Sequence, residues 1–311
     1  MRPDRDTDIG AGSWYNGSMS ELRIGTCSWK YDSWRGIVYP QTGPFDYLQE
    51  YSRHFDTVEV DRWFWSLFEK DKPVLPRTGD AREYAAAVPE DFRFTVKAPN
   101  SVTLSHHYQK DKQALLRANP HFLSSELYGE FLARLEPMLG KVGVVMLQFE
   151  YLNKQKIANK GDFLEKLAAF LKKRPEKPEL AIECRNPNYL DEDYFNCLKE
   201  HDAHHVFCQG YYMPPVWEIE AKYGGLLTDL AVLRLMGTDR KGIEAASNDS
   251  WNRIVEPRDR ELAEIVPMLQ RLRKRGQRVY VNINNHYEGS APKTAEKLGK
   301  MVQEEAGKRR K

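Results

Sequence analysis

Short runs of Val, Ile, Leu and Phe recur along the chain from Leu22 onward, and most are separated by segments with apolar residues at helical spacing. The apolar runs predict eight strands, at Leu22–Thr26, Thr57–Val60, Phe92–Lys97, Gly143–Phe149, Glu179–Cys184, His205–Gln209, Ala231–Met236 and Arg278–Asn284. The intervening pattern predicts helices at Phe45–His54, Ala81–Val88, Phe131–Gly140, Asp162–Lys173, Glu192–His201, Arg258–Arg275 and Thr294–Glu305. This alternation is typical of parallel strands joined by crossover helices.

Eight units of this kind fit a single (β/α)8 TIM barrel of the α/β class better than a doubly wound sheet, which seldom has eight equal units. We expect the barrel domain to span residues 21–305, with a long insertion after strand 3 at Pro99–Glu130. The sixth and seventh units have irregular loops at Tyr211–Thr228 and Thr238–Pro257.

Both ends of the chain lack this alternation. Residues 1–20 are rich in Gly, Asp and Ser and predict a disordered leader or an expression scar. Residues 306–311 form a basic tail with the character of a solvated end.

Alternation within the strands separates an apolar face from a polar one. One set of alternate residues in a barrel strand meets the helices and the other fills the interior. The apolar set identifies the inward residues as Glu59, Asp61, Lys97, Gln148, Glu183, Arg185, Arg234, Tyr280, Asn282 and Asn284. Branched aliphatic residues usually fill a barrel interior, so this many polar groups require an explanation.

Two explanations are open. The acidic residues Glu59, Asp61 and Glu183 could balance the basic residues Lys97, Arg185 and Arg234 in an internal salt-bridge network. Alternatively, the polar groups form a ligand site at the C-terminal mouth, where TIM-barrel enzymes place their active sites. We favour the site, because the polar residues concentrate toward the last positions of their strands.

Composition excludes several classes of protein. The chain has 311 residues, with 47 Lys and Arg against 45 Asp and Glu and a net charge of +2, so its total charge gives no support to a nucleic-acid or membrane partner. No stretch has the roughly 20 apolar residues of a membrane span, and no secretory signal is visible, so we expect a cytoplasmic protein. The four cysteines include no CxxC pair, which argues against a zinc ribbon or a redox motif. The sequence does not predict the oligomeric state.

Five motifs occur in order along the chain: RIGTCSWKYDSWRGIVYP, HFDTVEVDRWFW, FRFTVKAP, IECRNPNYL and VNINNHYEGSAP. Together they resemble the YecE-like family, domain of unknown function 72, over essentially the whole chain. The resemblance implies a TIM barrel and supplies no established reaction. Many family members carry His where this chain has Met236 and Asn186, and these departures weaken any proposal of a histidine-rich metal centre.

An anion site is one candidate function of the mouth. TIM barrels often hold phosphate with the loops after strands 7 and 8 and a nearby helix N-terminus. Gly289 and Ser290 lead into the last helix, and Arg185, Arg234 and Lys97 could supply positive charge. We therefore expect a small anionic or polar ligand, phosphate or carboxylate. The side chains expected to contact it are Arg185, Arg234, Gln148, Asn282, Asn284, Asn285, Trp29 and Ser290, beside the backbone of Gly289.

General acid/base chemistry of a hydrolase or lyase is a second candidate, with Glu59 and Glu183 as the carboxylates and Lys97 tuning one of them. His286 is the best single histidine for acid/base work. The aromatics Trp29, Tyr31, Trp34, Trp63 and Trp65 could form a platform for a sugar ring or nucleobase, or could pack between the first two strand–helix units.

Two further alternatives stay open. A metal-dependent phosphodiesterase similar in architecture to endonuclease IV needs several His and carboxylate ligands on strand ends. No histidine is predicted beside Glu59 and Glu183, so we expect no cofactor and keep a divalent metal as the weaker option. The other alternative is a non-catalytic binding module. In that case the insertion, which contains His106 and His107, would bind nucleic acid or a protein.

Overall fold

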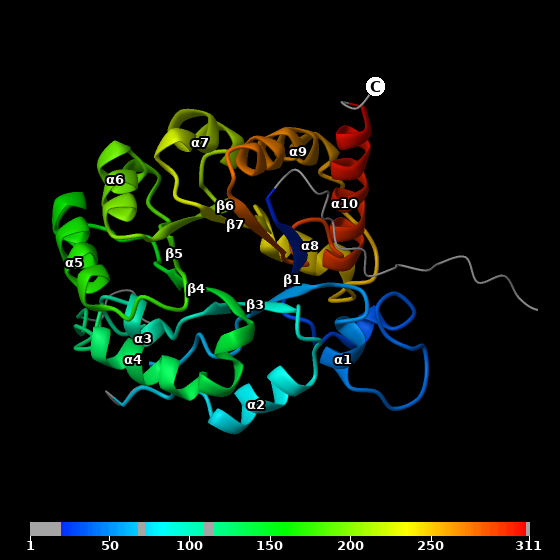
Figure 1. Ribbon diagram of the computed structural model, residues 1–311, viewed down its shortest axis with the longest axis horizontal. Coiled ribbons are helices and arrows are strands. Elements are labelled where there is room, and N and C mark those ends of the chain that lie inside the picture. Colours follow the sequence, from blue (N-terminus) through cyan, green and yellow to red (C-terminus); the bar gives the residue numbers. More distant parts are fainter. Residues whose placement is uncertain (1–19, 68–71, 109–114, 309–311) are drawn as a thin grey trace, which may run out of the picture.

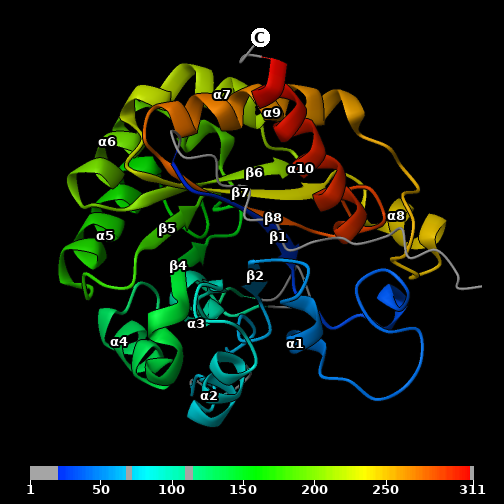
Figure 2. The same cartoon turned by 45° about the vertical axis from the view of Figure 1, so that its right-hand side comes forward.

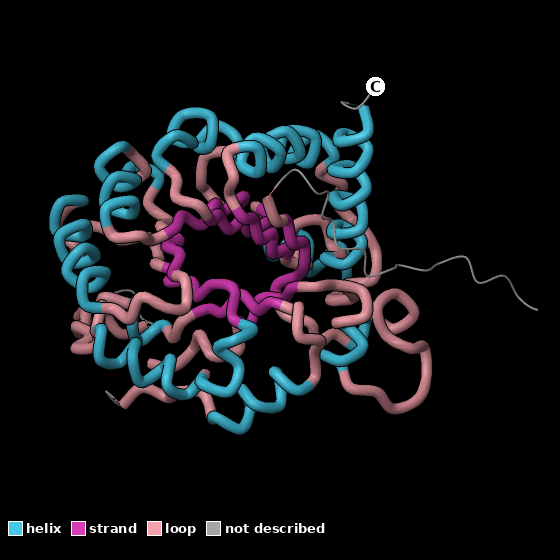
Figure 3. Tube along the Cα trace, viewed as in Figure 1, coloured by secondary structure: helices cyan, strands magenta, loops and turns pink. Residues whose placement is uncertain are grey.

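The computed structural model describes residues 20–67, 72–108 and 115–308. Its centre is a closed barrel of eight parallel strands in sequence order, which confirms the predicted (β/α)8 fold. Figure 3 shows the ring of strands enclosed by helices. The strands are β1 (Leu22–Cys27), β2 (Thr57–Val60), β3 (Arg93–Lys97), β4 (Val142–Gln148), β5 (Leu180–Glu183), β6 (His204–Gly210), β7 (Leu230–Gly237) and β8 (Arg278–Ile283).

The helices form the outer layer (Figure 1). The α-helices are α1 (Tyr47–Tyr51), α2 (Thr78–Ala86), α3 (Asn100–Thr103), α4 (Ser125–Arg134), α5 (Lys160–Lys173), α6 (Glu192–Glu200), α7 (Val216–Tyr223), α8 (Arg240–Ser247), α9 (Asp259–Lys274) and α10 (Ala291–Lys308). Short 3-10 helices are η1 (Asp32–Trp34), η2 (Glu136–Lys141), η3 (Pro187–Tyr189) and η4 (Gly224–Leu226). In Figure 2, α10 lies beside α9 and near β1, so the last helix closes the ring next to the first strand.

Every strand expected from the sequence is present within a few residues, and the helices differ more. The helix expected at Phe131–Gly140 is split at Leu135 into α4 and η2, because Pro137 stands at the start of the second piece. The last helix runs to Lys308, past its expected end at Glu305. The predicted leader lies outside the described residues, apart from Ser20, and so do residues 309–311 of the predicted tail.

Helices α3, α7 and α8 were not predicted, and two of them lie in the loops expected to be irregular. In α7 the buried residues Val216, Ile219 and Tyr223 have helical spacing, but the Pro-rich entry hides it. In α8 only Ile243 and Ser247 are buried, so the apolar signal is too sparse to read. Asp239 caps α8 by accepting a hydrogen bond from Gly242 N at 2.9 Å.

The apolar core has two layers. The larger one lies between strands and helices and contains Val58 and Val60 of β2 and Phe94 and Val96 of β3. A separate cluster fills the barrel interior: Val144, Met146, Ala181, Val206, Leu230, Val232 and Tyr280. The predicted inward and outward faces are therefore confirmed for these strands. Aliphatic residues fill the interior below the mouth, and polar residues occupy the mouth itself.

No helix among the described residues is long and apolar enough to cross a membrane.

Candidate functional site

Arg234 of β7 is the centre of the mouth. Its buried guanidinium donates from Nε and Nη2 to the two carboxylate oxygens of Glu59 at 2.8 and 2.7 Å. Its Nη1 donates to Glu183 Oε2 at 2.5 Å and to Gln148 Oε1 at 3.0 Å. One side chain therefore joins the ends of β2, β4, β5 and β7.

Glu59 and Glu183 are buried and use their oxygens within this network. Glu183 Oε1 accepts a second bond, from Arg185 Nε at 2.6 Å, and Cys27 Sγ lies 3.6 Å from Glu59 Oε2. Burial alone would raise the pKa of Glu183, but Arg234, Arg185 and Lys97 lower it to about 2. The salt-bridge network and the polar mouth are thus the same structure. The carboxylates act as fixed anions within it, and their catalytic role stays a prediction.

Arg185 follows β5 and is held on two sides. Its Nε donates to Glu183, and its guanidinium carbon stands 4.6 Å from the ring centroid of Tyr211. Its side chain is 17% exposed, and among the described residues its terminal nitrogens Nη1 and Nη2 have no hydrogen-bond partner. A guanidinium fixed in orientation with its outer fork open suits a carboxylate or phosphate.

Lys97 at the end of β3 is the third cation. It is 8% exposed, and its Nζ lies 3.9 Å from the ring centroid of Phe64. Within the described part of the chain, Nζ forms no hydrogen bond or ion pair, unlike the guanidinium of Arg234. Burial and the nearby charge of Arg234 lower the pKa of Lys97 to about 8. A lysine in this state supplies a neutral amine near physiological pH.

Asp61 lies near this lysine, and Tyr31 lies near Asp61. Burial, together with the charge of Glu59, raises the pKa of Asp61, whereas Lys97 and Arg234 lower it. Burial also raises the pKa of Tyr31, and the charge of Asp61 adds to the rise. Asp61 was among the residues predicted to face inward, but alternation within the strand does not distinguish it from Glu59 as a proton carrier.

The side-chain amides predicted to contact a ligand fall into two groups: some lie in the mouth, and others form hydrogen bonds that order the loop after β8. Gln148 contacts Arg234 directly, whereas Asn282 is fully buried and neither of its side-chain polar atoms has a partner among the described residues. Asn284 Oδ1 accepts from the backbone N–H of His286 at 2.9 Å. Asn285 Oδ1 accepts from Ala291 N at 2.9 Å and so orders the entry to α10. Ligand contact by these amides stays a prediction.

His286 stands to one side of the Arg234 network. Its Nδ1 is 2.5 Å from Asn284 Oδ1 and its Nε2 is 3.1 Å from Glu244 Oε1, a residue of α8. Its ring also contacts Trp251 edge-on at 5.0 Å between centroids. Burial lowers the pKa of His286, although Glu244 opposes this. The predicted acid/base histidine is therefore covered by α8 and held by two oxygens.

Gly289, Ser290 and Trp29 occupy packed positions. Gly289 has φ +104°, and a Cβ there would lie 2.7 Å from Val255 Cγ2, so the glycine permits close packing of two loops. Ser290 is fully buried, and Trp29 packs edge-on against Tyr84 with centroids 5.0 Å apart. All three residues are therefore packed against other parts of the protein, and ligand binding by them stays a prediction.

Residues 23–311 match the family described as "Protein of unknown function DUF72". The chain belongs to the DUF72 family. Its structure is similar to crystal structures of DUF72 family proteins from Enterococcus faecalis (TM-score 0.64, 19% identity) and Thermotoga maritima (TM-score 0.62, 22% identity). Each comparison covers 91% of this chain, with 95% of the first protein and 99% of the second. A comparison with curated proteins finds no match.

The resemblance seen in the sequence motifs is thus confirmed. The structural similarity at these identities shows the shared barrel and no specific activity.

Exposed tyrosines at the mouth are a feature that the sequence reasoning missed. Tyr151 follows β4, and Tyr211 and Tyr212 follow β6; they are 49%, 37% and 57% exposed. By contrast, Trp29, Trp34 and Trp63 of the predicted aromatic platform are buried. The sequence signal for these tyrosines is their position shortly after the predicted strands 4 and 6, whereas the predicted platform lay near strands 1 and 2.

The histidines near β6 have structural partners. His204 is 2.6 Å from Thr228 Oγ1 and 3.1 Å from Glu179 Oε2, and His205 is 3.1 Å from Tyr194 Oη. Among the described residues, no group of three or more His, Cys, Asp or Glu side chains could hold a metal ion. The metal-dependent alternative gains no support from these residues.

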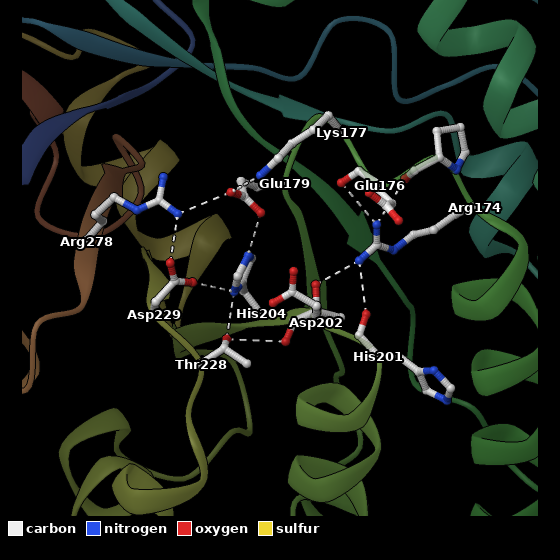
Figure 4. A network of polar contacts seen from close by, with 12 residues as sticks. Arg174, Glu176, Lys177, Glu179, His201, Asp202, His204, Thr228, Asp229 and Arg278 are labelled. Atoms are coloured by element: carbon white, nitrogen blue, oxygen red, sulfur yellow. Dashed lines mark hydrogen bonds and ion pairs between the residues drawn. The ribbon is translucent and has the colours of Figure 1, made fainter.

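Figure 4 shows the polar network around His204, away from the mouth. Glu179 accepts from Lys177 at 2.7 Å and from Arg278 at 3.2 Å, and Arg278 also bonds to Asp229 at 3.2 Å. A cavity of about 320 Å³ at the N-terminal ends of the strands includes Glu179 and Arg278 in its lining. These charges pair with each other, which is typical of the stabilising end of a TIM barrel.

Proposed function

We propose that the barrel mouth binds a small organic anion through Arg185 and transfers a proton to or from it through Lys97. The observation that carries this proposal is the state of Arg185. Its Nε bond to Glu183 and its stacking on Tyr211 fix its orientation, yet the fork of Nη1 and Nη2 is open among the described residues. Such a pre-oriented fork accepts a carboxylate or phosphate at little entropic cost.

The Arg234 network gives this proposal its electrostatic support. Arg234 donates to both carboxylate oxygens of Glu59 and shares Glu183 with Arg185. Neither carboxylate therefore needs the amine of Lys97 as a partner. Among the described residues, Arg185 Nη1 and Nη2 and Lys97 Nζ have no hydrogen-bond partner, so these donors are available for a ligand.

The spacing of the strands sets the size of the ligand. β3 and β5 flank β4, and neighbouring strands lie about 4.8 Å apart. The strand ends that carry Lys97 and Arg185 are therefore separated by roughly 10 Å. A ligand of a few carbon atoms could place its anionic group at Arg185 and a reacting atom at Lys97.

The proton chemistry would use Lys97 with Asp61. Burial lowers the pKa of the lysine to about 8 and raises that of the aspartate, so the two pKa values lie closer together than those of free side chains. Perturbed pKa values of buried groups that lie together are typical of functional sites. We therefore favour hydrolase or lyase chemistry by general acid/base catalysis, with Lys97 and Asp61 as proton carriers.

Arg185→Met tests the anion site. We expect it to weaken binding of inorganic phosphate or of a small carboxylate by roughly tenfold or more, because each charge-assisted hydrogen bond contributes about 1.5–3 kcal/mol. Isothermal titration calorimetry at low ionic strength would measure the change. Arg185→Lys keeps the charge without the fork and should give an intermediate affinity.

Arg53→Met is the matched control, since Arg53 is exposed after α1 and pairs with Glu50 at 3.2 Å. The control should bind phosphate as the wild type does. Equal phosphate affinity of wild type, Arg185→Met and Arg53→Met would contradict an anion site at Arg185.

A further inference from the structure

The exposed apolar side chains of this protein gather at one end of the barrel. Among the described residues, the large apolar side chains that are exposed all follow the ends of β2, β3, β4 or β6: Trp65, Val74, Tyr108, Leu115, Leu116, Tyr151, Tyr211 and Tyr212. All strands are parallel, so these loops surround the same mouth that contains Arg185. Contiguous exposed apolar patches mark interaction sites, and the part of this set that contacts Arg185 is formed by the tyrosines that follow β4 and β6.

Tyr151, Tyr211 and Tyr212, here called the tyrosine platform, lie next to Arg185. Tyr211 carries the guanidinium of Arg185 on its ring at 4.6 Å. Tyr151 and Tyr212 contact each other edge to face, with centroids 5.9 Å apart and an interplanar angle of 89°. Burial raises the pKa of Tyr212 and the charge of Arg185 opposes this rise, so that phenol lies near the guanidinium. The tyrosine platform therefore extends from Arg185 toward the surface of the protein.

The backbone holds the platform in an uncommon conformation. Tyr211 has φ +54°, and the preceding Gly210 has φ +131°. A Cβ at Gly210 would lie 2.3 Å from Gly237 O, so the end of β6 needs glycine to approach β7 this closely. Tyr211 N then donates to Gly237 O at 3.0 Å. A bulky residue in the left-handed region is strained, and such strain concentrates at functional sites.

We infer that the tyrosine platform binds a planar ring of the ligand whose anionic group binds Arg185. The ligand class is thus a small ring-bearing anion, such as an aromatic phosphate, an aromatic carboxylate or a mononucleotide. This inference rests on the proposed function and narrows its substrate class. Charge complementarity selects the occupant, because a ring on the platform places its anionic substituent beside the open fork of Arg185.

The test compares anions with and without a ring. Phosphate, ethyl phosphate, phenyl phosphate, benzoate and adenosine monophosphate are titrated into the full-length chain by calorimetry. We expect phenyl phosphate to bind at least roughly fivefold more tightly than ethyl phosphate. Adenosine monophosphate and benzoate then distinguish a nucleotide from a simpler aromatic acid.

Tyr212→Ala should remove this preference for a ring and leave phosphate affinity unchanged, whereas Tyr212→Phe should keep it. Trp65→Ala is the matched control, because Trp65 is 60% exposed but follows β2 and lies with Tyr108. It should retain the wild-type preference. Thermal unfolding of each variant shows whether the fold is kept.

Equal affinity for ethyl and phenyl phosphate in the wild type would overturn this inference and leave the anion site intact. Loss of the ring preference in Trp65→Ala but not in Tyr212→Ala would also overturn it. Tighter binding of a single-stranded oligonucleotide than of adenosine monophosphate would show that the ligand is a macromolecule instead. If none of the anions binds, the proposed function itself fails.

Discussion

Arg234→Met should lower the free energy of unfolding by about 3–5 kcal/mol, the usual cost of removing one partner of a buried ion pair. The substitution leaves the buried carboxylates of Glu59 and Glu183 without the guanidinium that joins them. Urea unfolding at pH 7 followed by circular dichroism would measure the loss, and the melting temperature should fall by roughly 10 °C.

The pH dependence of this effect has a definite sign. In the wild type the pKa of Glu183 is lowered to about 2, below its unfolded value of about 4.3. Its stabilising contribution is therefore present above pH 4.3 and is lost as the pH falls from about 4.3 to 2. Without Arg234 the lowering is reduced, so the stability difference between wild type and variant should shrink over that same interval.

Two controls separate charge from packing. Arg240→Met removes an exposed ion pair and should change stability by less than about 1 kcal/mol. Adding Glu59→Gln and Glu183→Gln to Arg234→Met removes the uncompensated charges and should restore much of the loss. A loss below about 1 kcal/mol for Arg234→Met alone would show that the network is not a major stabilising feature.

The amine of Lys97 should titrate near pH 8, in contrast to surface lysines, which titrate near about 10.4. At pH 8 about half of the Lys97 amines would be neutral, roughly two orders of magnitude more than at an ordinary lysine. Competitive labelling with acetic anhydride over a pH series, quantified by peptide mass spectrometry, gives the midpoint for each lysine. The midpoint is the readout, because partial burial affects the absolute rate and leaves the midpoint unchanged.

Asp61→Asn provides a signed control for this titration. The carboxylate of Asp61 raises the pKa of Lys97, so its removal should move the midpoint further down. Phe64→Leu keeps an apolar neighbour and removes the ring that lies 3.9 Å from Nζ, and it should also lower the midpoint. A wild-type midpoint near 10.4 would remove Lys97 from the proposed proton transfer.

The fold was largely predictable because its signal is repeated along the chain. Each strand carries alternating apolar residues, as at Val58 and Val60, and both belong to the core between strands and helices. The helix α8 was missed for the opposite reason. It buries only Ile243 and Ser247, so its position depends on a cap and on contacts such as Glu244 with His286, which join distant parts of the chain.

The location of the candidate site was predictable from the sequence, whereas the roles of its individual residues were less so. Alternation placed Glu59, Lys97, Glu183 and Arg234 in the mouth, and the structure brings them together there. Which charges pair and which stay open depends on the relative heights of strand ends and on side-chain direction. The spacing of residues within one strand specifies neither the height of its end relative to other strands nor the direction of each side chain.

The sequence by itself determined the barrel, the order of its strands and the face of each strand that carries charge, because these follow from periodicity within short segments. Only the tertiary structure decided that Arg234 pairs with both glutamates, that Arg185 Nη1 and Nη2 and Lys97 Nζ have no hydrogen-bond partner among the described residues, and that three tyrosines form the exposed platform. The physical reason is that pairing, desolvation and exposure depend on distances between strands that are far apart in sequence.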